Sequence, residues 1–144
     1  MVNNDTIELL KECNAGIKME ISSINEVLPS VSNNELKEKL VTCRNEHQQL
    51  ENETKDILND YGDVGEKPNI MAESMSWIKT NVKMAMKPDD ETISDLMTDG
   101  CNMGVKSLNR YLNQYEAAEE KVKDITKRLI NLEEKLAVDI RKFL

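Results

Sequence analysis

A regular spacing of apolar residues between Asn34 and Tyr61 limits the folds open to this chain more than any other feature. Positions three and four residues apart in alternation carry Leu36, Leu40, Cys43, His47, Leu50, Thr54, Ile57 and Tyr61. Residues at this spacing share one face of an α-helix. The pattern predicts one long amphipathic helix whose apolar seam must be buried against other helices. His47, the one histidine of the chain, lies in the middle of that seam.

Three more long helices follow from the same spacing. The first begins at Asn3 to Asp5, stops at Pro29 and has the seam Ile7, Leu10, Asn14, Ile17, Ile21, Ile24 and Leu28. The third opens at Pro88 to Glu91 and contains Gly100 and Gly104, which suit either a close helix crossing or a slot for a bulky side chain such as Trp77. We place a break around Asn113 to Glu116. The last helix runs from about Ala117, with the seam Ala118, Val122, Ile125, Leu129, Leu132, Leu136, Ile140 and Phe143.

A shorter helix is predicted between the second and third long helices, over about Asn69 to Met86, after a loop from Tyr61 to Pro68. Its apolar residues occupy more than one face, which is typical of a helix between layers or at a subunit contact. Its methionines suit either gap-filling packing or an adaptable binding surface. We expect a homodimer with Trp77 in or near the contact.

Composition narrows the class of protein. The chain has 144 residues, 32% charged and 3% aromatic, with five glycines and three prolines, and we interpret residues 1–144 as a single all-α domain. Its net charge of −8 makes nucleic acids and anionic membranes poor partners. No apolar run reaches the ~18 residues of a membrane span, and no signal-peptide pattern is seen. We therefore expect a cytoplasmic protein whose three cysteines are reduced and buried.

Four long helices with a shorter helix between the second and third predict a four-helix bundle with one long crossover. The order of several short features resembles the ferritin-like superfamily, and within it a family of small uncharacterised bacterial ferritin-like four-helix proteins. These features are Leu9-Leu10-Lys11-Glu12 before Gly16, then Trp77, Asp89-Asp90-Glu91 before Ile93, and Gly100. The resemblance covers nearly the whole chain and implies the ferritin-like fold.

The resemblance also implies where a di-metal centre would lie, and the ligands expected there are largely missing. Such centres take a Glu from each of two helices and Glu-x-x-His from each of the other two. Helix one has Asn14 and Ala15 in the middle of its seam, with Glu12 and Glu20 beside it. Arg44 precedes His47 by three residues, and Cys101 and Asn102 follow Gly100. The seam of helix four has Leu132 and Leu136, while Glu133 and Glu134 are assigned to a solvated face.

These residues favour a degenerate metal site. We expect no metal or other cofactor, and a buried His47 without a carboxylate partner, bonded to Asn14 or to a trapped water. Cys43, four residues before His47, is interpreted as its core neighbour, although the pairing could lower the thiol pKa. The alternative is a single metal ion, iron or manganese, at Asn14, His47 and Glu51. The chain is thus interpreted as a non-enzymatic structural or protein-interaction bundle. The other hypothesis is a metal-binding protein or oxidoreductase with a reduced or partner-completed site.

Overall fold

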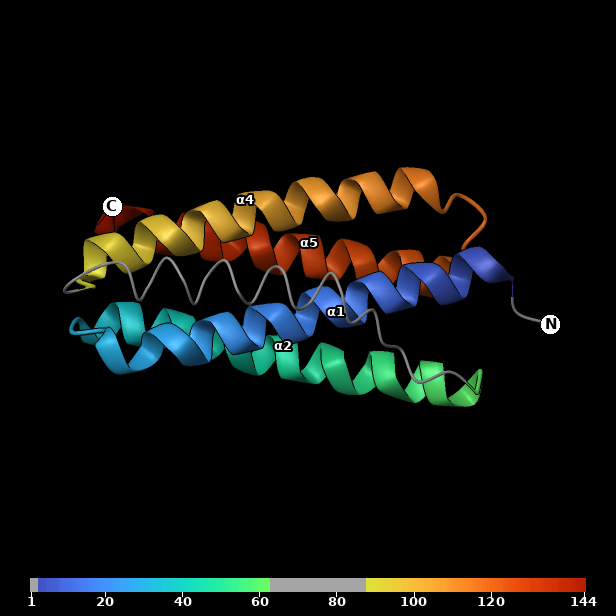
Figure 1. The fold of residues 1–144 in the computed structure, drawn as a ribbon, viewed down its shortest axis with the longest axis horizontal. Helices are drawn as coiled ribbons and strands as arrows, with labels where there is room; N and C mark the ends of the chain where they lie inside the picture. Colours follow the sequence, from blue (N-terminus) through green and yellow to red (C-terminus); the bar gives the residue numbers. More distant parts are fainter. Residues whose placement is uncertain (1–2, 63–87) are drawn as a thin grey trace.

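The computed structural model describes residues 3–62 and 88–144, which fold into a bundle of four long α-helices (Figure 1). The helices are α1 (Asn4–Val27), α2 (Asn34–Asp60), α4 (Asp90–Gln114) and α5 (Glu120–Ile140). Short 3₁₀ turns, η1 (Leu28–Ser30) and η2 (Arg141–Phe143), follow α1 and α5. The described residues contain no β-strand, so the predicted all-α class and the four long helices are confirmed.

Asparagine and aspartate side chains begin three of these helices. Asn3 accepts a hydrogen bond from the Thr6 amide at 2.9 Å, Asn33 accepts from the first turn of α2, and Asp89 accepts from the Thr92 amide. Each bond satisfies an amide that the helix itself leaves unpaired. The helix α2 ends at Asp60, and two residues later Gly62 has a positive φ of 72°, the left-handed conformation that glycine adopts without strain. The predicted limits of α2 therefore agree with the structure to one residue.

The helices run in two antiparallel pairs. The helix α1 packs on α2, α4 packs on α5, and the pairs meet through contacts of α1 with α4 and of α5 with both α1 and α2. Figure 1 shows that α2 and α4 run in the same direction, so α2 ends where α4 does and α4 begins at the opposite end of the bundle. The predicted crossover helix at 69–86 and Trp77 lie outside the described residues, so the homodimer through Trp77 stays a prediction.

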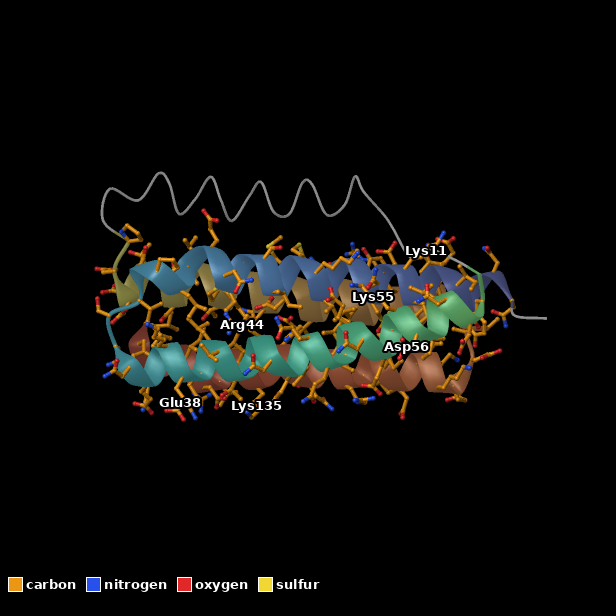
Figure 2. The ribbon with its side chains drawn as sticks, turned by 90° about the horizontal axis from the view of Figure 1, so that it is seen from below. Lys11, Glu38, Arg44, Lys55, Asp56 and Lys135 are labelled. Carbon is orange, nitrogen blue, oxygen red and sulfur yellow. The ribbon has the colours of Figure 1, made fainter. Side chains whose placement is uncertain are left out.

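Backbone-to-side-chain bonds tie the two pairs together at the ends of the bundle. The Asp90 carboxylate accepts from the amides of Ser32 and Asn33 at 2.8 and 3.0 Å, which joins the start of α4 to the start of α2. At the other end, the Glu119 amide donates to the Thr6 hydroxyl at 2.9 Å. Charged side chains such as Glu38, Lys55, Asp56 and Lys135 cover the outer faces (Figure 2). None of the helices described is both long and apolar enough to cross a membrane.

The predicted seams of α1 and α5 are partly wrong. Leu129 is buried as expected, but Ile21 and Leu132 are only partly buried, and Glu20 and Glu133 beside them are buried instead. A helix with two or three neighbours buries a stripe wider than one heptad column, so the centre of the stripe can lie between two apolar columns. In α1 and α5 that centre passes through a glutamate.

The buried apolar residues form two clusters. One holds Leu9, Ile17, Leu50, Leu108 and Leu129 among others, and the second holds Ile24, Leu40, Met97, Leu136 and Ile140 among others. All three cysteines are buried free thiols, as predicted, with Cys13 in the first cluster and Cys43 and Cys101 in the second. On α1, α2 and α5 the boundary between the two clusters is occupied by Glu20, His47 and Glu133.

Candidate functional site

Each of the four helices contributes at least one ionisable side chain to the interior near the middle of the bundle. These side chains are Glu20 from α1, His47 from α2, Cys101 from α4 and Glu133 from α5, and none is more than 6% exposed. Apolar packing places them there: Glu20 lies between Ile17 and Ile24, and Glu133 lies between Leu129 and Leu136, three or four residues from each. This spacing puts both carboxylates on the buried face of their helices. We call these four residues the central cluster.

The central cluster is compact. One carboxylate oxygen of Glu20, one of Glu133 and the Cys101 sulfur all lie within 4.8 Å of one another. The Nε2 atom of His47 lies 3.0 Å from Oε1 of Glu133. The cluster therefore brings two oxygens, one nitrogen and one sulfur together inside the core.

Hydrogen bonds fix the orientation of the His47 ring. Its Nδ1 lies 2.8 Å from the backbone oxygen of Cys43, and because a carbonyl only accepts, Nδ1 carries a proton. The Nε2 atom then either accepts a proton from a neutral Glu133 or donates one to the ionised carboxylate. Both ring nitrogens are thus committed to partners other than Asn14. The expectation of a His47–Asn14 bond and of a histidine without a carboxylate partner was wrong.

Burial favours the protonated form of the acidic groups. Desolvation raises the pKa of Glu133 to about 7, although the hydrogen bonds from Glu20 and Cys101 act to lower it. The pKa of Glu20 is also raised, first by burial and then by the nearby Glu133 carboxylate. Burial likewise raises the pKa of the Cys101 thiol and of the Cys43 thiol, so the idea that His47 lowers the pKa of Cys43 was wrong. Without a cation, the cluster holds several protons near neutral pH.

Two oxygens of the central cluster lack hydrogen-bond partners. In the part of the chain that the structure describes, Oε1 of Glu20 and Oε2 of Glu133 are buried and accept no hydrogen bond. A buried carboxylate oxygen without a donor costs roughly 1–3 kcal/mol or more. A ligand with a positive charge would satisfy both atoms at once.

The structure places the other predicted site residues outside the cluster contacts. Asn14 is buried in α1, 1% exposed, and has no bond to His47. Glu51 has a 20% exposed side chain and pairs with Lys55 at 3.5 Å. Arg44 donates to Asn25 at 3.0 Å on the surface. His47 alone of the three metal candidates, Asn14, His47 and Glu51, belongs to the central cluster.

Two functional candidates, Glu20 and Glu133, were assigned to positions beside the seam or on a solvated face, and the structure corrects both assignments. Their spacing from Ile17, Ile24, Leu129 and Leu136 was the signal that could have revealed them. Gly104 of α4 lies beside Glu133, and a Cβ there would be 3.6 Å from its carboxyl group. This glycine therefore faces Glu133, and the slot for Trp77 stays a prediction because Trp77 lies outside the described residues.

The donor set does not fit a ferritin-like di-metal centre, which takes six ligands, most of them carboxylates. The described residues offer four donors, one of them a thiol. Four mixed O, N and S donors do suit one ion, since Zn²⁺ binds carboxylate, imidazole and thiolate at about 2.0–2.3 Å, which puts its ligands about 3–4 Å apart. The ligand atoms of Glu20, Cys101 and Glu133 lie within 4.8 Å of one another and need only small inward shifts to reach that range, while His47 adjoins them through Glu133.

Comparison of the chain with protein-family models, with curated proteins and with solved structures finds no match. The chain's own geometry therefore identifies it only as an all-α four-helix bundle with a buried Glu-His-Cys-Glu cluster.

Proposed function

We propose that this protein binds one divalent transition-metal ion of the zinc type in the central cluster of its bundle. One observation carries the proposal: Glu20, Cys101 and Glu133 converge within 4.8 Å in the core, and each carboxylate has a buried oxygen that no described donor reaches. His47 lies beside these three residues: its Nδ1–H bonds to a backbone carbonyl, as in many metal-ligating histidines, and its Nε2 lies 3.0 Å from Oε1 of Glu133.

The chemistry of the donors selects the class of ion. A thiol and an imidazole disfavour Mg²⁺ and Ca²⁺, which take oxygen ligands, whereas Zn²⁺ and Co²⁺ accept all three donor types. Two carboxylates and the Cys101 thiolate supply the negative charge that a divalent ion requires. The raised pKa of Glu20, of Glu133 and of Cys101 means that the ion must displace protons on binding.

The fold supports a ferritin-like topology, because the parallel directions of α2 and α4 are those of a bundle with one long crossover (Figure 1). The proposal thus corresponds to the second hypothesis drawn from the sequence, a metal-binding protein whose site has fewer ligands than a di-metal centre.

The purely structural, non-enzymatic bundle remains the second candidate. The pKa of about 7 at Glu133 favours it, since protons alone could neutralise the cluster.

Co²⁺ binding to metal-free protein tests the proposal. We expect one Co²⁺ per chain at pH 8, with tetrahedral visible absorption and a thiolate-to-cobalt band in the near ultraviolet. Cys101→Ser should remove the thiolate band. Cys13→Ser is the matched control, because Cys13 is equally buried but bonds to Thr126 at 3.1 Å in the first apolar cluster. Absence of Co²⁺ binding would support the purely structural bundle instead, and a thiolate band that survives Cys101→Ser would place the ion at another cysteine and overturn the site in the central cluster.

A further inference from the structure

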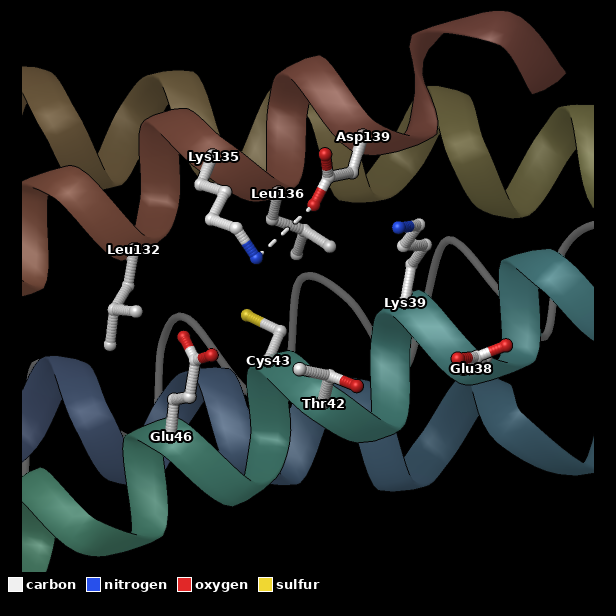
Figure 3. Close-up of a pocket in the computed structure, with 9 residues that line it drawn as sticks. All are labelled: Glu38, Lys39, Thr42, Cys43, Glu46, Leu132, Lys135, Leu136 and Asp139. Carbon is white, nitrogen blue, oxygen red and sulfur yellow. Dashed lines mark ion pairs between the residues drawn. The ribbon is translucent and has the colours of Figure 1, made fainter.

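A surface pocket lies between α2 and α5 (Figure 3). Its lining includes Cys43, Glu46, Lys135 and Asp139. Figure 3 shows the Cys43 sulfur pointing into the space between the two helices, with the Glu46 carboxylate beside it. Cys43 is 6% exposed, whereas Cys13 and Cys101 are fully buried, so Cys43 is the thiol that solvent reaches from this pocket.

A short series of contacts leads from this pocket to the central cluster. The Cys43 sulfur lies 3.4 Å from Nδ1 of His47, and Nε2 of the same ring lies 3.0 Å from Glu133. Cys43 and His47 are one helical turn apart on α2, so their side chains lie on the same face of that helix. The pocket and the cluster are thus separated by one thiol and one imidazole.

The charges around the pocket favour a cation. Glu38, Glu46 and Asp139 line it together with Lys39 and Lys135, and Lys135 pairs with Asp139 at 3.5 Å. With Lys135 paired to Asp139, the Glu46 carboxylate lies three residues from Cys43 on the same helix. The Glu46 carboxylate is the more exposed and weaker ligand for a zinc-type ion, and the Cys43 thiol is the more buried and stronger one. An ion could therefore pass from Glu46 to Cys43 as it moves inward.

We infer that this pocket is the access route by which the metal ion reaches the central cluster, with Glu46 as the outer ligand and Cys43 as the transient inner one. The inference rests on the proposed function, since it assigns a route to the same site. Cys43 releases its thiol proton to water while it contacts the ion. It takes a proton back from water when the ion moves inward to His47 and Glu133.

The rate of Zn²⁺ uptake by the metal-free full chain tests the route. A chromophoric chelator reports uptake in stopped flow, and the final stoichiometry is measured on the same samples. Glu46→Lys should slow uptake roughly tenfold, because it reverses the charge at the mouth, and should leave one ion bound per chain at equilibrium. Cys43→Val, which replaces the thiol by a slightly larger apolar side chain, should slow uptake similarly.

Glu134→Lys is the matched control, because Glu134 is exposed on α5 and does not line the pocket. It should leave the rate of uptake unchanged. Equal rates in Glu46→Lys, Glu134→Lys and the unaltered protein, with one ion bound in each, would overturn the route but keep the metal site. Absence of bound Zn²⁺ in the unaltered protein would overturn both. Glu46 lies on the surface side of α2, so its variant keeps the test valid even if Cys43→Val does not fold.

Discussion

Glu133 makes the stability of the metal-free protein depend on pH. Its pKa is about 7 in the folded chain, raised by burial from 4.5. Between these values the folded chain binds more protons than the unfolded chain, so the free energy of unfolding falls as pH rises, by up to ~1.4 kcal/mol per pH unit. The stabilising effect of the bound proton is complete below the lower value and lost above the higher one. Glu20, whose pKa is also raised, acts in the same direction.

Glu133→Gln should flatten this pH dependence, because the amide keeps the shape of the side chain but does not titrate. Urea unfolding in the presence of a chelator at pH 5 and pH 8 measures the change. We expect the variant to lose less stability than the unaltered protein between the two pH values. Glu134→Gln, one residue away on the exposed face, should behave like the unaltered protein. Parallel pH profiles for all three proteins would contradict the buried, proton-binding role of Glu133.

At the scale of the helices, the contact between Asp90 of α4 and the start of α2 can be tested by a single substitution. Its carboxylate accepts from two backbone amides, those of Ser32 and Asn33, and so holds the start of α2 against the start of α4. Asp90→Ala should lower the free energy of unfolding by ~1–3 kcal/mol, because both amides lose a charged acceptor. Glu91→Ala removes an acidic side chain from the same first turn without this contact, so it controls for the helix dipole. Equal losses in urea unfolding would show that the dipole alone matters.

Most helix limits could be predicted because local residues determine them. Asn33 caps α2, Pro29 follows the end of α1, and the break after Gln114 falls within the predicted range. The buried face of a helix is harder to predict, because it depends on which neighbours pack against it. A glutamate between two apolar columns, such as Glu20 or Glu133, is assigned to solvent when each helix is considered alone. The partner of His47 was missed because Glu133 lies 86 residues away in sequence.

For the molecule as a whole, the central cluster joins all four helices, so a bound ion should stabilise the bundle as one unit. Zn²⁺ at 100 times its dissociation constant should add ~2.7 kcal/mol to the free energy of unfolding. At a fixed concentration of Zn²⁺ the gain should be larger at pH 8 than at pH 6, because protons compete for Glu20, Cys101 and Glu133. Thermal unfolding followed by circular dichroism measures the shift in Tm. Cys101→Ser should reduce the shift, and an unchanged Tm with excess Zn²⁺ would argue against the site.

The position of the central cluster between two apolar clusters has a consequence for the alignment of the helices. Aliphatic side chains alone would let a helix slide by one heptad and still bury apolar residues against apolar residues. With one ionisable residue at the same level in each helix, such a slip would put Glu20 or Glu133 against leucines and isoleucines. The cluster therefore sets the register of the bundle, as a single buried polar residue does in coiled coils. A sequence with four apolar residues there would gain packing and lose its unique alignment.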